Sequence, residues 1–122
     1  PQSIHQLGGY KVQGRDAEGR ARLIEEAKGL EQIGCFAIVL ECVPASLAKE
    51  ISGAVSAPTI GIGAGPHCDG QVLVMHDMLG MGKYTKFSKV YFDVGAAMKT
   101  AFEAYVSEVK SGAFPTADHS FE

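Results

Sequence analysis

The segment 36–40, Phe-Ala-Ile-Val-Leu, is the feature that most constrains how this chain folds. All five side chains are apolar, which predicts a strand that is covered on both faces. Strands of that kind belong to parallel sheets with helices packed on their faces. The segment continues to Glu41, and Pro44 ends the stretch that can pair in a sheet. The chain is therefore expected to be an α/β protein.

Three helices are expected from apolar residues at helical spacing. The first is capped by Asp16 and stopped by Gly34, a second follows Pro44, and the last covers about 94–110. The apolar residues that share one side of each helix are Leu23, Ile24, Ala27, Leu30 and Ile33 in the first, Leu47, Ile51, Ala54 and Val55 in the second, and Val94, Ala97, Met98, Ala101, Phe102, Tyr105 and Val109 in the last.

Two further strands are expected at 59–63 and 71–76, with a glycine-rich loop between them. Segment 80–90 is expected to be a loop with at most a short helical turn, and the tail 116–122 has no periodic pattern. Helices and strands in this order are typical of a parallel α/β fold. A doubly wound sheet can be complete at 122 residues, whereas a (β/α)₈ barrel needs about 250, so the chain would be only part of one.

Composition excludes several classes of function. The chain has 14 acidic and 11 basic residues and no basic cluster, so nucleic acid is not an expected partner. No apolar run approaches the roughly 20 residues that cross a bilayer, and residues 1–5 do not resemble a signal peptide. The three cysteines, Cys35, Cys42 and Cys68, lack metal-site spacing and are expected to be reduced, Cys35 and Cys42 as small buried residues. A cytoplasmic location is therefore expected.

Glu41 is the strongest candidate for chemistry because it stands where the apolar strand ends. In both α/β architectures, ligands bind at the carboxyl ends of the strands. Partial desolvation there would raise the pKa of its carboxyl group and make it a better general base near neutral pH. The alternative is a structural glutamate that pairs with a lysine or accepts hydrogen bonds from backbone amides.

The glycines at 61, 63 and 65 invite comparison with a nucleotide-binding loop. The dinucleotide motif is GxGxxG leading directly into a helix, whereas here the spacing is GxGxG and Pro66 follows. We expect these glycines to shape a turn near the strand ends and not to bind a dinucleotide.

Two histidine-containing groups lie near strand ends. His76 and Asp77 are expected to end the third strand, on the same edge as Glu41 but pointing to opposite faces. His67, Cys68 and Asp69 lack the spacing of metal ligands and are expected in a loop. No metal ligand or cofactor-binding residue is assigned within the chain.

Five segments of the chain together carry a resemblance to a known family. They are Gly8–Arg15 (GGYKVQGR), Val39–Pro44 (VLECVP), Ile60–Gly65 (IGIGAG), Asp69–Asp77 (DGQVLVMHD) and His119–Phe121 (HSF). These segments resemble the ketopantoate hydroxymethyltransferase family, and the similarity runs in order through essentially all 122 residues. They match the C-terminal part of that family, starting inside the loop after the fifth barrel strand.

The resemblance implies a (β/α)₈ TIM-barrel enzyme of pantothenate biosynthesis, of which residues 1–122 supply about three βα units. The family transfers a one-carbon unit from 5,10-methylenetetrahydrofolate to 3-methyl-2-oxobutanoate and forms 2-dehydropantoate. Mg²⁺ chelates the keto acid and is held by carboxylates of N-terminal strands, which these residues do not include. Glu41 matches the family's proton acceptor. Chelation would make the C3 proton acidic enough for a carboxylate to remove.

The expected partners are the keto acid, the folate, the N-terminal half of the same protein and further copies in a homo-oligomer. Two other functions remain open. One is a lyase or mutase of the same barrel type that acts on a small keto acid around Mg²⁺. The other is a non-catalytic βα module that binds a nucleotide at the glycine loop.

Overall fold

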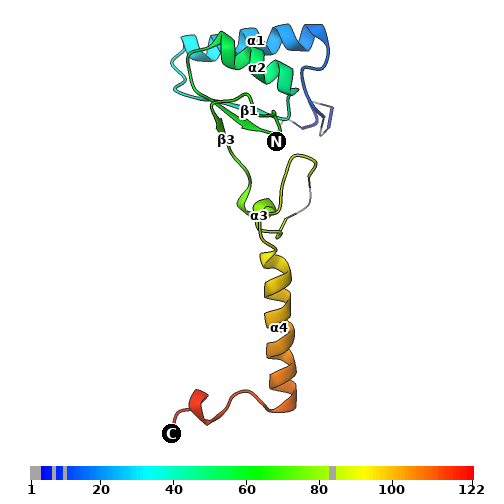
Figure 1. The fold of residues 1–122 in the computed structure, drawn as a ribbon, viewed down its shortest axis with the longest axis vertical. Coiled ribbons are helices and arrows are strands. Elements are labelled where there is room, and N and C mark those ends of the chain that lie inside the picture. The colour runs from blue at the N-terminus through cyan, green and yellow to red at the C-terminus, as the bar shows by residue number, and fades with distance from the viewer. Residues whose placement is uncertain (1–3, 7, 10, 83–84) are drawn as a thin grey trace. The chain divides into compact units, whose positions relative to one another are not determined.

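The computed structural model describes residues 4–6, 8–9, 11–82 and 85–122 (Figure 1). The chain divides into two compact units, residues 1–73 and 74–122, which we call the first and second unit and describe separately. The first unit is mixed α/β with a small parallel sheet, as the sequence predicts. The regular secondary structure among the described residues of the second unit is helical.

The first unit runs helix, strand, helix, strand, strand in chain order. The elements are α1 Ala17–Gln32, β1 Ile38–Glu41, α2 Ala45–Ala54, β2 Thr59–Ile62 and β3 Gly70–Gln71. The strands run parallel in the order β1-β2-β3, and the β1–β2 register joins Ile38 to Thr59 and Glu41 to Ile62. β3 is short and pairs with β2 at two positions.

The core of the first unit lies between the sheet and its two long helices, which pack on one side of it (Figure 1). Ile38 and Leu40 of β1 are buried together with Leu47 and Ile51 of α2. Ala27 is the buried residue of α1, and Leu23 and Ile24 of the same helix are partly buried against the core. Leu47 and Ile51 are the largest apolar side chains with almost no exposure, which places the centre of the core on α2.

The expectation that β1 is covered on both faces is wrong for the described residues. Val39, which alternates with the buried Ile38 and Leu40, is 60% exposed. Phe36, placed in this strand from the sequence, precedes β1 and is 92% exposed. The reason is that α1 and α2 form a single layer, and the face that carries Val39 has no second layer among the described residues.

Polar contacts connect α1 to α2 and to the loop that enters β2. Arg20 of α1 donates hydrogen bonds to Ser46 and Glu50 of α2. The Glu31 carboxylate accepts hydrogen bonds from the backbone N–H groups of Ser56 and Ala57, at 2.6 and 2.8 Å. A charged acceptor makes the stronger kind of hydrogen bond, so Glu31 fixes the entry to β2 from the end of α1.

A buried threonine anchors the start of β2. Thr59 is fully buried, and both its backbone N–H and its hydroxyl donate to Asp69 Oδ2, at 2.8 and 2.9 Å. The Thr59 hydroxyl also lies 2.7 Å from the Ser52 hydroxyl of α2. Asp69, expected only to lie in a loop, therefore joins the approach to β3 to the start of β2.

The third strand is shorter than predicted. Only Gly70 and Gln71 pair as β3, and one further hydrogen bond runs from Val72 N–H to Gly61 C=O. Val72 and Val74 are about half exposed, at 48% and 49%, so no packed layer favours an extended strand there. The chain instead forms a one-turn helix, α3 (Met75–Met78), which contains His76 and Asp77. These two residues therefore do not end a strand.

The second unit holds α3, the long helix α4 (Val94–Ser111) and a short 3₁₀ helix (Ala117–His119). Asp93 caps α4 by accepting a hydrogen bond from Ala96 N–H, and Gly112 ends it in the left-handed conformation. The prediction of a helix over about 94–110 is confirmed. In segment 80–90 the described residues form no helix or strand, and residues 83 and 84 lie outside the described part.

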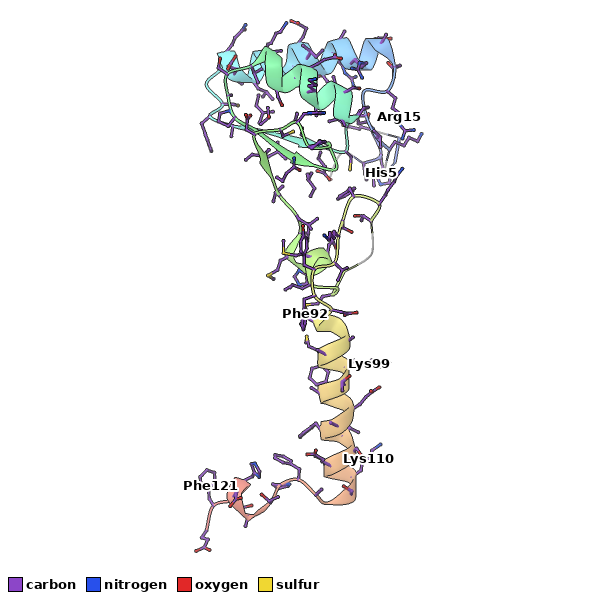
Figure 2. The ribbon with its side chains drawn as sticks, in the orientation of Figure 1. His5, Arg15, Phe92, Lys99, Lys110 and Phe121 are labelled. Carbon is purple, nitrogen blue, oxygen red and sulfur yellow. The ribbon has the colours of Figure 1, made fainter. Side chains whose placement is uncertain are left out.

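The apolar side chains of α4 are largely exposed within the chain. The exposed fractions are 40% for Met98, 60% for Phe102 and 56% for Tyr105. Phe92 and Phe121 also project from the ribbon, 64% and fully exposed respectively (Figure 2). The predicted apolar stripe thus forms on the helix without a layer of described residues to cover it.

We expect Asp69 to make stability depend on pH. Hydrogen bonds from the Thr59 backbone N–H, then from its hydroxyl, lower the pKa of the Asp69 carboxyl group. A folded-state pKa below the unfolded value gives stability that is present above the unfolded pKa and lost as pH falls through the folded pKa. In a complete chain that contains these residues, Asp69→Asn should lower the melting temperature at neutral pH, and the difference from wild type should shrink below about pH 4.

Thr59→Val provides the control, because it removes one of the donors to Asp69. In that background Asp69→Asn should have a smaller effect at neutral pH. A melting-temperature difference that stays constant from neutral to acidic pH would contradict this role of Asp69.

Candidate active-site rim

Glu41 is the last residue of β1 and pairs with Ile62, the last residue of β2. Because the two strands are parallel, their carboxyl ends lie at the same edge of the sheet. The residues that follow them, Cys42 after β1 and 63–65 after β2, meet there, and we call this edge the rim. Glu41 alternates with the buried Leu40 and lies on the same face as Val39, the face that the helices leave open.

The Glu41 side chain is exposed in the described structure, so the partial desolvation expected for it is not provided by these residues. The cause is the same as for Val39. The layer that would cover this face is not formed by α1 or α2. The position of Glu41 at a strand end is as predicted, and its surroundings are not.

Cys42 has an unusual backbone conformation directly after Glu41. Its φ of 52° is in the left-handed region, which residues other than glycine rarely occupy. Its N–H donates to Ile62 C=O at 2.9 Å, and its C=O accepts from Gln13 N–H at 3.1 Å. Burial raises the pKa of the Cys42 thiol, and the nearby Glu41 charge raises it further. A thiol with a raised pKa is a poor nucleophile, which argues against a reactive cysteine at the rim.

The segment before α1 reaches the rim through Gln13, a contact that the sequence analysis missed. Gly14, which follows, is buried with a φ of 69°. A side chain there would overlap Leu47 of α2 and come within 2.8 Å of Leu23 of α1. Gly14 thus lets this segment lie against both helices. The Gln13 contact uses a backbone N–H, so the residue type at position 13 does not indicate it. Gly14 could have indicated the close approach of this segment to the helices.

The glycine loop lies against the start of α2. Gly65 has a φ of 77°, and a side chain on it would overlap that of Ala45. Gln71 of β3 donates a side-chain hydrogen bond to Gly65 C=O at 2.9 Å. Gly61, within β2, faces Cys68 and Gln71 so closely that a Cβ would lie only 3.0–3.1 Å from their side-chain atoms. These glycines therefore allow close packing at the rim.

The other candidate residues belong to several different parts of the chain. Asp69 contacts the start of β2, at the edge opposite the rim. His76, which is exposed, and Asp77 belong to the second unit. Cys35, Cys42 and Cys68 are free thiols and are half-buried, not fully buried as two of them were expected to be. Within the described residues, no three His, Cys, Asp or Glu side chains are grouped so that they could hold a metal ion.

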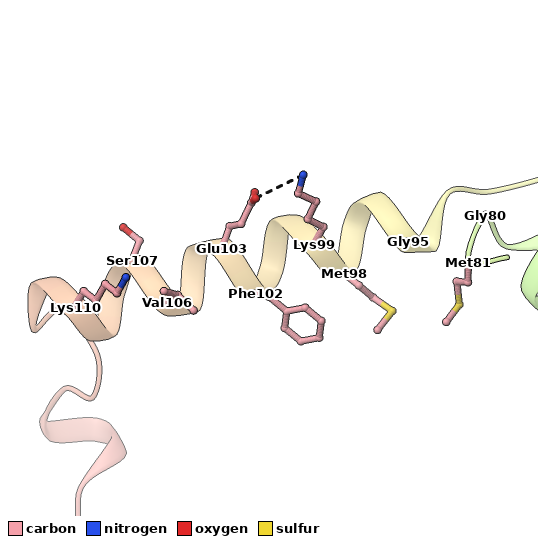
Figure 3. A pocket seen from close by; sticks show the side chains of 10 residues that line it. All are labelled: Gly80, Met81, Gly95, Met98, Lys99, Phe102, Glu103, Val106, Ser107 and Lys110. Carbon is pink, nitrogen blue, oxygen red and sulfur yellow. Dashed lines mark ion pairs between the residues drawn. The ribbon is translucent and has the colours of Figure 1, made fainter. Parts of the chain in front are cut away.

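A shallow pocket lies along α4 in the second unit (Figure 3). Its apolar side is formed mainly by Met98, Phe102 and Val106, and Lys99 pairs with Glu103 at 3.8 Å on the other side. Ser107 and Lys110 also line the pocket, and the Lys99–Glu103 ion pair is exposed. No helix in the described part of the chain is long and apolar enough to span a membrane.

Comparison with known proteins identifies the family. The model of the ketopantoate hydroxymethyltransferase family matches residues 1–117. The chain belongs to the ketopantoate hydroxymethyltransferase family, a family of enzymes. It is 58% identical to a 3-methyl-2-oxobutanoate hydroxymethyltransferase of Clostridium novyi and 56% identical to one of Geobacter metallireducens. A protein of the same name from Shewanella loihica is 52% identical.

The chain spans about half the length of the hydroxymethyltransferases that it matches. All of it aligns with the Clostridium protein and 99% of it with the other two, which corresponds to 45%, 46% and 47% of those relatives. The family that the motifs indicated is therefore confirmed over nearly the whole chain.

We expect the rim to depend on glycine at position 65. Gly65→Ala should destabilise a complete chain by about 1–3 kcal/mol, because the new methyl group overlaps Ala45 and the backbone is left-handed. Gly29→Ala is the matched control, since open space surrounds Gly29 within α1. That control should be neutral or stabilise by up to about 1 kcal/mol. Urea unfolding measures both, and equal effects would contradict the close-packing role of Gly65.

Proposed function

We propose that this chain is the C-terminal portion of a (β/α)₈ barrel enzyme that adds a hydroxymethyl group to 3-methyl-2-oxobutanoate. The one-carbon donor is 5,10-methylenetetrahydrofolate, and the product is 2-dehydropantoate, a step of pantothenate biosynthesis. The family match over residues 1–117 carries the proposal. The relatives' printed name, 3-methyl-2-oxobutanoate hydroxymethyltransferase, supports the substrate and the transferred group.

The barrel is supported by the one-sided packing of the first unit. In a (β/α)₈ barrel, helices cover the outer face of the parallel strands, and the inner face is filled by side chains of the other strands. α1 and α2 cover one face here, while Val39 and Glu41 lie on the face left open. β1 pairs with β2 alone among the described strands, so its other edge is free to accept a preceding strand. We propose that residues 1–122 form part of one barrel domain.

Glu41 is the proposed proton acceptor. Active sites of such barrels lie at the carboxyl ends of the strands, which is where Glu41 stands. Its carboxylate takes the proton from C3 of the keto acid, and the electron pair of that C–H bond forms the enolate. The enolate carbon then bonds to the methylene carbon of the donor. A water molecule supplies the hydroxyl oxygen, both bonds from that carbon to the folate nitrogens break, and tetrahydrofolate leaves with protons on those two nitrogens. An inner barrel face would also supply the desolvated surroundings that these residues alone do not provide.

The Mg²⁺ expected from the family does not fit the described residues, which provide no group of three possible ligands. We propose that the metal belongs to carboxylates of the N-terminal strands. The partners proposed for this chain are accordingly the N-terminal half of the protein, the keto acid and the folate. A homo-oligomer and a cytoplasmic location stay predictions.

Glu41→Gln tests the assignment in a complete enzyme that carries these residues, such as a chimera with the N-terminal part of the Clostridium relative. Loss of a general base costs about 10²–10⁴-fold in rate, whereas keto-acid affinity should change little because Gln preserves the shape. The measurements are turnover, exchange of the C3 proton into deuterated water, and keto-acid binding by calorimetry. Glu25→Gln, on the exposed side of α1, is the control and should leave all three unchanged.

Exchange at the wild-type rate in Glu41→Gln would refute the proton-acceptor role. The same calorimetry distinguishes the nucleotide-binding alternative. Saturable micromolar binding of NAD or FAD at the glycine loop, without keto-acid binding in the presence of Mg²⁺, would favour that alternative instead.

Residues 1–122 alone should lack turnover and should associate or unfold easily. The exposed apolar residues on β1 and α4 need partners, and unpaired strand edges pair with whatever is available. Adding the N-terminal part as a separate chain should restore a cooperative thermal transition and activity. Light scattering, calorimetric unfolding and turnover measure this. A monodisperse, cooperatively melting and active 122-residue chain would contradict the partial-barrel proposal.

A further inference from the structure

The connection between Glu41 and α2 is only three residues long, and each of them is constrained. Val43 is buried, and Pro44 begins the helix with its ring-fixed φ of −57°. Cys42 is the one residue other than glycine that has a positive φ within the described part of the chain. A left-handed turn at this point reverses the direction of the chain immediately after Glu41.

Two hydrogen bonds from different elements hold that turn in place. The Cys42 N–H extends the β1–β2 ladder by donating to Ile62 C=O, one residue beyond the regular strand. Its C=O accepts from Gln13 N–H, in the segment that Gly14 packs against α1 and α2. A change of the Cys42 backbone angles would break at least one of these bonds or move Glu41, because β2 fixes the residues before it.

We infer that Cys42 is a positioning residue for Glu41, and that its left-handed backbone, held between Ile62 and Gln13, sets where the Glu41 carboxylate lies at the rim. This inference rests on the proposed role of Glu41 as proton acceptor. The role belongs to the backbone at position 42 and not to the thiol. The thiol stays protonated beside Glu41 because burial and the adjacent carboxylate both raise its pKa.

The inference predicts that the activity of variants at position 42 follows how readily the new residue adopts the left-handed backbone conformation. How closely the new side chain resembles cysteine should matter less. Glycine adopts the left-handed region freely, whereas a β-branched residue strongly resists it. Valine, although apolar and small, should therefore be worse at position 42 than glycine. A catalytic group displaced by about 1 Å loses on the order of 10²-fold in rate.

The test compares Cys42→Gly, Cys42→Val and the control Cys35→Val in the complete enzyme. Cys35 is also a half-buried free thiol, but it precedes β1 and has no positive φ. We expect kcat and C3-proton exchange to fall about 10–100-fold in Cys42→Val, with KM and keto-acid affinity within about threefold of wild type. Cys42→Gly and Cys35→Val should stay within about threefold in every measurement.

Gln13→Pro is the second variant, because it removes the N–H that binds Cys42 C=O without changing residue 42. It should lower kcat with keto-acid binding retained, even where Cys42→Val does not fold. Wild-type kcat in both Cys42→Val and Gln13→Pro would overturn the inference, as would a loss in Cys42→Gly equal to that in Cys42→Val. Glu41→Gln distinguishes a failure of the proposed proton-acceptor role from a failure of the positioning role. Exchange retained in that variant refutes the proton acceptor, whereas exchange lost there but normal in the position-42 and position-13 variants refutes only the positioning role.

Discussion

The parallel pairing of β1 with β2 is the interaction on which the first unit depends. Four residue pairs, from Ile38–Thr59 to Glu41–Ile62, align the two strands so that both end at one edge. The same register places Ile38 and Leu40 over Leu47 and Ile51, which gives the sheet its buried face. Removing this pairing would separate Glu41 from the glycine loop and open the core at once.

The rim that results is assembled from segments that are distant in the sequence. Gln13 reaches it from before α1, Cys42 from the end of β1 and Gly65 from beyond β2. None of the three contributes a reactive side chain. Their contacts are backbone hydrogen bonds and close packing, so they determine how the segments of the rim are arranged. The proton transfer proposed for this chain is carried out by the carboxylate of Glu41.

Features decided by local interactions could be predicted from the sequence. The long helices follow from apolar spacing and from caps such as Asp16, whose carboxylate accepts the Gly19 N–H at 2.7 Å. Glu41 was placed at a strand end because the apolar run stops there. The resemblance to the hydroxymethyltransferases was also detectable, since several motifs match in order. The comparison over residues 1–117 confirms that family.

Features decided by tertiary contacts could not be predicted. The apolar residues 72–75 are typical of a strand, but a strand forms only where a neighbour pairs with it, and pairing ends after Gln71. Val39 and Glu41 are exposed because no second layer of described residues covers their face of the sheet. The left-handed turn at Cys42 depends on hydrogen bonds from Ile62 and Gln13, which the residue type does not indicate.

The shortness of the link between β1 and α2 has a consequence for how the length of such chains can vary. Each residue of the link 42–44 is held in place. The backbone of Cys42 makes hydrogen bonds to two other segments, Val43 is buried, and Pro44 caps the start of α2. An inserted residue would rotate α2 or displace Glu41. At the opposite edge, the turn after α1 contains Gly34, which has open space around it. Evolutionary insertions and engineered tags should therefore be tolerated at that turn and excluded from the link after β1.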